Sequence, residues 1–260
     1  MCSISQSLLL VLNPKQGCIS MIVKLKIFRF EPRNDKEPHY DFFAVDVKPT
    51  DRLLDCLNKI RWEQDGSLAY RMSCAHGICG SDGMTINGVS ALACQKLVKD
   101  YDADKEILIE PLSVFSVVKD LVVDMEPFFE REKSVHPHGG ISLTQAEEGK
   151  EHLQTIEQRL QFDDDIKCIM CACCVSACPV NQKEDSAYVG PAAVVRAHRY
   201  IFDSRVKDML ERLRIMDKSH GAWSCKSYYK CTQVCPKEIQ VTKRILEVKR
   251  KIIDELQPKK

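Results

Sequence analysis

Four cysteines follow one another in a single short run, and this run limits the fold of the chain more than any other feature. Residues 167–179 read K-C-I-M-C-A-C-C-V-S-A-C-P, which places Cys168, Cys171, Cys174 and Cys178 at steps of three, three and four before Pro179. Three thiolates at the first spacing can surround one face of an iron–sulfur cage, each meeting a different iron. The fourth cysteine lies one turn further along, so its sulfur points toward a different cluster. The run therefore predicts a partner run elsewhere in the chain.

A second cysteine run completes the first. Residues 225–236 read C-K-S-Y-Y-K-C-T-Q-V-C-P, with cysteines at steps of six and four and a proline after the last. On the two-cluster ferredoxin pattern C-x2-C-x2-C-x3-C-P, these cysteines take the first, third and fourth positions, and Tyr228 takes the second. If each run lends its fourth cysteine to the other, the first site has four thiolates, as [4Fe-4S] requires: Cys168, Cys171, Cys174 and Cys235. The second site has three: Cys178, Cys225 and Cys231.

Three thiolates favour a [3Fe-4S] cluster, which is a cubane without its unsupported corner. The alternative is a [4Fe-4S] cluster with water or another ligand at the open corner. We favour [3Fe-4S] because position 228 offers only a phenol.

Residues 74–94 carry a third group of candidate ligands, in the plant-type [2Fe-2S] order C-x4-C-x2-C…C with aspartate at the third position. These are Cys74, Cys79, Asp82 and Cys94. Gly77 and Gly80 lie in the same stretch, where a glycine-rich loop lets backbone N–H groups approach a cluster closely. Asp82 is either an iron ligand or a turn residue beside Gly83. We favour ligation because the other three ligands are in register.

Other uses of cysteine fit this chain poorly. Ten of its 14 cysteines fall at cluster spacings, and no early apolar run resembles the signal peptide expected of a disulfide-bonded exported protein. Structural zinc is usually held by two separated pairs rather than by one evenly spaced run. No apolar stretch is long enough to span a bilayer, and the net charge of +1 lacks the basic excess that is typical of nucleic-acid-binding proteins. We therefore expect a protein of a cytosol-like compartment with no nucleic-acid partner.

Hydrophobic periodicity predicts a mixed first part and a helical second part. Strands are expected at 22–30, 40–47, 84–86, 89–94 and 106–110, and helices at 52–64, 119–126, 192–202, 206–216 and 241–256. The Asn87-Gly88 pair predicts a tight hairpin between the third and fourth strands. The expected fold class is α+β, with an N-terminal β-grasp, plant-type [2Fe-2S] ferredoxin domain followed by an all-α two-cluster ferredoxin domain.

Four regions are expected along the chain. Residues 1–20 are interpreted as a disordered or non-native extension before Met21, and residues 21–125 as the [2Fe-2S] ferredoxin-like domain. Residues 126–150, with H-P-H-G-G at their centre, are expected to be a connector. Residues 151–260 are expected to form the α-helical domain with the [4Fe-4S] and [3Fe-4S] sites.

The three motifs, in this order, closely resemble the iron–sulfur subunit of succinate dehydrogenase and fumarate reductase. The resemblance runs from about Met21 to the C-terminus. It includes R-M-S-C-A-H-G-I-C-G-S-D-G-M-T-I-N-G at 71–88, K-D-L-V-V-D-M at 119–125 and G-P-A-A-V-V-R-A-H-R-Y-I-F-D-S-R at 190–205. The family uses aspartate as a [2Fe-2S] ligand, which strengthens that interpretation of Asp82.

The resemblance implies partners and a role that the residues alone do not. Such subunits sit between a flavoprotein subunit, which oxidises succinate at FAD, and membrane anchor subunits that reduce quinone, with or without haem b. Electrons would pass from flavin through [2Fe-2S], [4Fe-4S] and [3Fe-4S] to quinone. The implied location is peripheral, on the cytoplasmic face of a bacterial inner membrane, and no catalytic residue is expected in this chain.

The family's quinone pocket borrows residues next to the cysteine runs. Pro179 matches, whereas Lys183 and Lys226 stand where ubiquinone-using members often carry tryptophan and histidine. The resemblance thus names Pro179, Lys183 and Lys226 as quinone-proximal, and it leaves open the quinone type and the direction, including net fumarate reduction. Surface lysines are the alternative interpretation of both cations.

Three alternative functions remain to be weighed. A soluble multi-cluster carrier would need fewer clusters in line than this chain provides. A zinc-dependent interaction module conflicts with the cysteine spacing. A thiol-driven fumarate reductase subunit usually has a further cysteine-rich domain, and only 24 residues follow Pro236 here.

Overall fold

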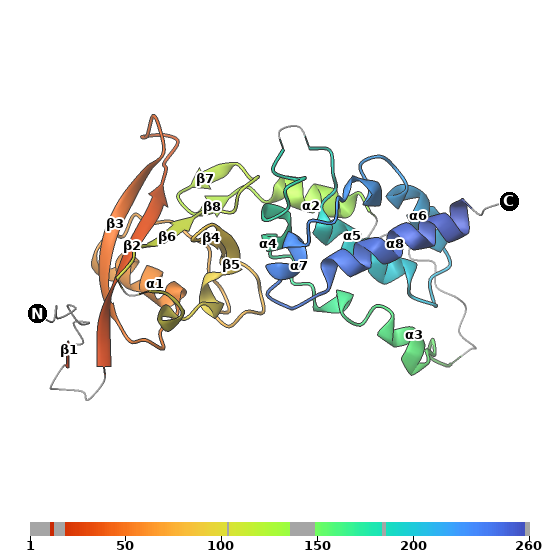
Figure 1. Cartoon of the computed structure of the whole chain (residues 1–260), viewed down its shortest axis with the longest axis horizontal. Helices are drawn as coiled ribbons and strands as arrows, with labels where there is room; N and C mark the ends of the chain where they lie inside the picture. Colours follow the sequence, from red (N-terminus) through yellow and green to blue (C-terminus); the bar gives the residue numbers. More distant parts are fainter. Residues whose placement is uncertain (1–10, 13–18, 103, 136–148, 184–185, 258–260) are drawn as a thin grey trace, which may run out of the picture. The chain divides into compact units, whose positions relative to one another are not determined.

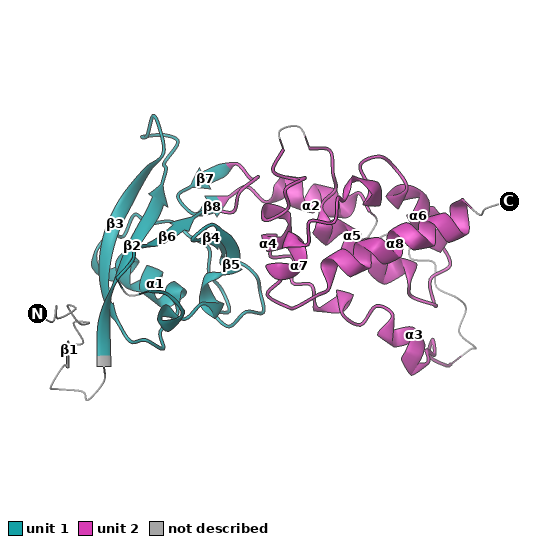
Figure 2. Cartoon of the chain, viewed as in Figure 1, with its two compact units in different colours: residues 1–111, 117–122 teal, residues 112–116, 123–260 magenta. Residues whose placement is uncertain are grey.

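The computed structural model describes residues 11–12, 19–102, 104–135, 149–183 and 186–257 (Figure 1). The expected extension at 1–20 lies almost entirely outside the described residues. Its described part contains β1 (Val11–Leu12), which pairs antiparallel with β2 (Ile19–Arg29). The chain divides into two compact units: residues 1–111 with 117–122, and residues 112–116 with 123–260 (Figure 2).

A mixed sheet forms the centre of unit 1. Its strands are β2, β3 (His39–Val47), β4 (Gly83–Ile86), β5 (Val89–Leu92) and β6 (Ile107–Glu110), with β1 at one edge. The order is β1-β2-β6-β4-β5, and β3 pairs with β2. The β2–β6 pair is parallel, and the β2–β3 and β4–β5 pairs are antiparallel.

The core of unit 1 follows from the alternation in β2. Val23, Leu25 and Ile27 are buried, while the lysines between them face outward. The helix α1 (Leu53–Glu63) contacts β3 and buries its leucines on one face. Asn87 and Gly88 both have positive φ, so the predicted tight hairpin is confirmed. Short 3-10 turns, η1 (Ala93–Gln95) and η2 (Val98–Asp100), follow β5.

One predicted element of unit 1 is wrong. The helix expected at 119–126 is replaced by a small hairpin of β7 (Val117–Lys119) and β8 (Val122–Val123). The buried carboxylate of Asp120, at φ +46°, accepts hydrogen bonds from the backbone N–H groups of Phe30 and Ala69 and thereby holds the turn. The helix begins only at Glu126, because Pro127 fits the first turn of a helix but not its interior.

Unit 2 is built from helices, as expected. The longer ones are α2 (Glu126–Lys133), α5 (Pro191–Ile201), α6 (Met209–Met216) and α8 (Val241–Leu256). The shorter ones are α3 (Ile156–Leu160), η3 (Asp165–Lys167), α4 (Cys173–Ser176), η4 (Ala222–Ser224) and α7 (Lys230–Gln233). A shared core joins α5, α6 and α8 through residues such as Val194, Leu213 and Ile245. None of the helices in the described parts of the chain combines the length and apolarity needed to cross a bilayer.

The compact units differ from the expected domain boundaries in the middle of the chain. The first residues of the expected connector form α2, which contacts α5 within unit 2. Residues 112–116, expected in the first domain, also belong to unit 2. The rest of the expected connector, 136–148, lies outside the described residues.

Candidate metal centres

The first candidate site lies in unit 1, in the loop between α1 and β4. The sulfur of Cys74 accepts hydrogen bonds from the N–H groups of Ile78 and Cys79, at 3.4 and 3.3 Å. Hydrogen bonds from the loop backbone, led by that of His76, lower the pKa of the Cys74 thiol to about 6. A thiolate is the form that binds metal, so this loop is prepared to supply one at neutral pH.

Asp82 and Cys94 lie on the hairpin that follows this loop. Asp82 directly precedes β4 and Cys94 follows β5, so the hairpin brings them together. Their exposed fractions are 3% and 2%, and the Asp82 carboxylate accepts a hydrogen bond from the Cys94 N–H at 2.6 Å. The backbone of Gly77 in turn hydrogen-bonds to the Cys94 thiol. The Asp82 carboxylate therefore lies buried beside a candidate ligand cysteine, where it can both hold the loop and reach the site.

The two cysteine runs of unit 2 share one backbone pattern. In the first, η3 precedes Cys168, Met170 and Ala172 have positive φ, and α4 follows. In the second, η4 precedes Cys225, residues 227 and 229 have positive φ, and α7 follows. Each of these features of the second run follows its counterpart in the first run by the same number of residues. This constant offset pairs Cys171 with Tyr228. The predicted alignment, with a phenol at the second position of the second run, therefore has a structural counterpart.

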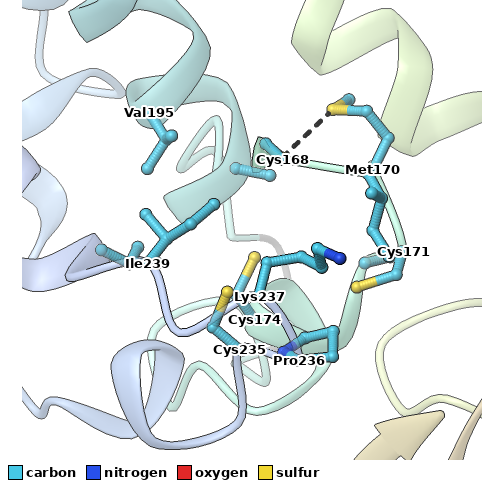
Figure 3. A pocket seen from close by; sticks show the side chains of 13 residues that line it. Cys168, Met170, Cys171, Cys174, Val195, Cys235, Pro236, Lys237 and Ile239 are labelled. Carbon is cyan, nitrogen blue, oxygen red and sulfur yellow. Dashed lines mark hydrogen bonds between the residues drawn. The ribbon is translucent and has the colours of Figure 1, made fainter. Parts of the chain in front are cut away.

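One pocket is bordered by four cysteines from both runs (Figure 3). They are Cys168, Cys171, Cys174 and Cys235. The pocket encloses about 400 Å³ of space, part of it open to solvent, and its other walls include Val195 and Ile239. The Cys168 thiol lies 3.8 Å from the Met170 sulfur. This is the set of four cysteines that is predicted if each run lends its fourth cysteine to the other.

A second pocket, of about 280 Å³, is bordered by the other three cysteines: Cys178, Cys225 and Cys231. Pro179, Lys226 and Tyr228 lie on the same pocket. The structure thus gathers the predicted three-thiol set and keeps it separate from the four-thiol set.

The chemistry of both pockets fits iron–sulfur clusters. Burial raises the pKa of the Cys168 thiol to about 11, and burial also raises the pKa values of Cys174, Cys178 and Cys231. Such thiols become thiolates only beside a strong positive charge such as bound iron. Among the described residues, no three His, Cys, Asp or Glu side chains converge as a single ion would require. Sulfur donors from two separate cysteine runs on each pocket suit a cluster of several atoms.

The predicted quinone-proximal residues are divided between two pockets. Pro179 and Lys226 border the three-cysteine pocket, whereas Lys183 lines another, of about 890 Å³, with Arg131 and Ser113. Sequence reasoning also missed two residues of the three-cysteine pocket, Tyr188 and Thr242. Neither lies in a cysteine run, and no local pattern marks them.

Comparison with known proteins agrees with this arrangement. Residues 24–130 match the family model described as a 2Fe-2S iron-sulfur cluster binding domain, and residues 166–239 match a 4Fe-4S dicluster domain. A chain of the Mycobacterium smegmatis Sdh1 complex shares the fold, with a TM-score of 0.83 at 23% identity over 92% of this chain and 99% of its own.

Two curated relatives are more similar in sequence. The succinate dehydrogenase iron-sulfur subunit of Coxiella burnetii is 37% identical over 231 residues, which cover 88% of this chain and 96% of that protein. The mitochondrial succinate dehydrogenase [ubiquinone] iron-sulfur subunit of Candida glabrata is 37% identical over 229 residues, covering 87% and 90%. This chain therefore belongs to the family of succinate dehydrogenase iron-sulfur subunits.

Proposed function

We propose that the chain holds three iron–sulfur clusters and conducts single electrons between them. The ligands of [2Fe-2S] are Cys74, Cys79, Asp82 and Cys94. The ligands of [4Fe-4S] are Cys168, Cys171, Cys174 and Cys235, and those of [3Fe-4S] are Cys178, Cys225 and Cys231. Bound clusters of these types accept and release one electron at a time. The observation that carries the proposal is the repeated backbone of unit 2, with four cysteines on one pocket and three on the other.

The chain is the electron-transfer subunit of a succinate:quinone oxidoreductase complex. Its partners are a flavoprotein subunit that carries FAD and membrane anchor subunits where quinone reacts, with or without haem b. Family membership supports this role. The side chains of this subunit bind the clusters and surround them with protein. They do not act as acids, bases or nucleophiles, because the hydride chemistry belongs to the flavin.

The proposed domains are a [2Fe-2S] domain around unit 1 and a two-cluster domain around unit 2. The subunit is peripheral in a membrane-associated complex, and we place it on the cytoplasmic face of a bacterial inner membrane. Net fumarate reduction would use the same clusters in the opposite order.

Pro179, Lys183 and Lys226 are proposed to lie near the quinone. Lys226 is exposed and borders the three-cysteine pocket, so its ammonium group can donate a hydrogen bond to a quinone oxygen close to the last cluster. Lys183 lines a different pocket, beside Arg131 and Ser113.

Metal analysis and EPR of the full chain, purified without oxygen and reconstituted, test this function. We expect about nine irons and ten sulfides per chain, compared with about two zincs for four-thiolate zinc sites. The oxidised protein should show the signal of a [3Fe-4S] centre, and the reduced protein that of a [2Fe-2S] centre. A folded, colourless protein without iron would refute the proposal.

A further inference from the structure

A buried phenol faces the three-cysteine pocket without a hydrogen-bond partner. Tyr188 has an exposed fraction of 2%, and within the described residues its hydroxyl has no partner. Its carbonyl oxygen accepts hydrogen bonds from the Asn181 side chain at 3.1 Å and from Arg131 at 3.3 Å, so its backbone is held in place. A buried hydroxyl left unpaired destabilises the fold. Such a cost points to a partner inside the pocket that Tyr188 lines.

A second hydroxyl of the same pocket already points at a ligand sulfur. The Thr242 hydroxyl oxygen lies 3.4 Å from the Cys231 sulfur. Thr232 accepts the Thr242 N–H at 2.9 Å and donates its own hydroxyl proton to the Thr242 hydroxyl at 3.0 Å. The Thr242 hydroxyl therefore already accepts one hydrogen bond, and its own proton is available to donate. A thiolate at Cys231 carries no proton and can only accept. Thr242 must therefore be the donor when Cys231 is ionised.

We propose that Tyr188 and Thr242 donate hydrogen bonds to the second cluster. Thr242 donates to the sulfur of Cys231, and Tyr188 donates to a sulfide or thiolate sulfur within the same pocket. This inference rests on the proposed function, because it requires a cluster at that site. Hydrogen bonds to cluster sulfurs stabilise the more negative, reduced state and so raise the reduction potential. Both residues thus raise the reduction potential of the second cluster and make it a better electron acceptor.

The test is a redox titration of the intact, cluster-loaded protein followed by EPR. At a fixed potential, Tyr188→Phe and Thr242→Val should each lower the ratio of reduced to oxidised second cluster about three- to tenfold. A tenfold change in this one-electron ratio corresponds to ~59 mV. The potentials of the other two clusters should stay unchanged, which makes each variant its own internal control.

Two control variants separate hydrogen bonding from packing. Thr242→Ser keeps a hydroxyl and should restore the potential. Tyr200→Phe changes a buried phenol of α5 that lies outside the pocket lining, and it should leave the potential unchanged. Without iron, Tyr188→Phe should be at least as stable as the unaltered chain, because it removes an unpaired buried hydroxyl.

The two ways of failing are distinguishable. In one case, the unaltered protein shows the second-cluster signal, and the second cluster of Tyr188→Phe and Thr242→Val has the same reduction potential as in the unaltered protein. The inference is then overturned and the proposed function stands. If the unaltered protein shows no second cluster at all, the proposed function itself is overturned.

Discussion

At the scale of single residues, the proposed [3Fe-4S] cluster depends on Tyr228. This residue occupies the position that Cys171 occupies in the first run, and its side chain borders the three-cysteine pocket. A phenol at this position leaves one corner of a cubane without a thiolate. The exposed fraction of Tyr228 is 54%, so a smaller side chain can replace it without leaving a cavity in the core.

We predict that Tyr228→Cys converts the second cluster to [4Fe-4S]. The added thiolate supports the fourth iron, so the EPR signal of the oxidised [3Fe-4S] centre should fall by more than about tenfold while iron rises by about one per chain. Tyr229→Cys is the matched control, because its side chain is 52% exposed but stands one position out of register. An unchanged signal in Tyr228→Cys, or equal loss in both variants, would show that the two runs are misaligned.

Which site residues the sequence reveals depends on how local their geometry is. Spacing within each run is local, and with the exchange of the fourth cysteines it predicts the two sets of cysteines that border the two pockets. Tyr188 and Thr242 reach the second pocket through the packing of other elements, and nothing near them in the sequence marks that contact. Lys183 shows the opposite case, because it lies close to Cys178 in sequence yet lines a different pocket.

At the scale of elements, a buried charge network connects η3, α5 and α8. On α5, His198 is fully buried and its ring stacks on Phe202. Its Nδ1 lies 2.5 Å from Asp165 of η3, and its Nε2 lies 3.1 Å from Glu247 of α8. Two ionised carboxylates on opposite ring nitrogens favour the imidazolium form of His198, in which both nitrogens donate. Because η3 leads directly into Cys168, the network holds the start of the first run against two helices.

The charges of the network are coupled. Burial alone would lower the pKa of His198, but the hydrogen bonds and charges of Asp165 and Glu247 outweigh it and raise the pKa. Burial raises the pKa of Asp165, and the hydrogen bond and charge of His198 and the charge of Arg244 offset part of that rise. Burial would also raise the pKa of Glu247, but His198 and Arg244 lower it to about 2.

We predict that His198 stabilises unit 2 less as pH rises. Its folded pKa lies above the unfolded value of about 6.5, so its contribution is complete below that value and is lost as pH rises through the folded pKa. His198→Gln should cost about 3 kcal/mol at pH 6, because it removes a buried cation from Asp165 and Glu247 and leaves Arg244 beside them. The cost should shrink at higher pH. Thermal unfolding of the cluster-loaded protein from pH 6 to 9 measures both effects.

The exposed His39 provides the control for this pH profile. It lies 3.9 Å from Asp41 and is about half exposed, so His39→Gln should leave the profile unchanged. If His198→Gln and the unaltered chain lost stability in parallel as pH rises, the imidazolium would not be the cause.

The elements themselves were predictable where a periodic pattern covers the whole element. The stripe at 241–256 became α8, and the alternation at 22–30 became most of β2. The hairpin at 117–123 was not predictable, because Asp120 holds its turn by binding the distant amides of Phe30 and Ala69. Secondary-structure propensity depends on neighbouring residues in the sequence and does not reflect such long-range contacts.

At the scale of the whole molecule, the two units place their candidate ligands differently. In unit 2, candidate ligands such as Cys178 and Cys231 belong to the hydrophobic core, and the two runs face each other across the pockets. In unit 1, the sheet and α1 bury their own apolar side chains, and the ligand loop lies outside the strands. The sequence predicts the division into a mixed part and a helical part, but not which candidate ligands belong to the hydrophobic core of their unit.

We predict that removing iron with a chelator under reducing conditions loosens unit 2 far more than unit 1. Metal binding contributes directly to folding where its ligands join separate segments, and cysteines of residues 168–178 and 225–235 border the same two pockets, which the proposed clusters would bridge. Hydrogen exchange of the full chain should therefore accelerate by about tenfold or more in both runs, α5 and α8, while β2, β6 and α1 change little. Restoring iron and sulfide should restore protection. Equal loss in both units would mean that the clusters do not hold the helical unit together, and protection unchanged in both would mean that its apolar core suffices without them.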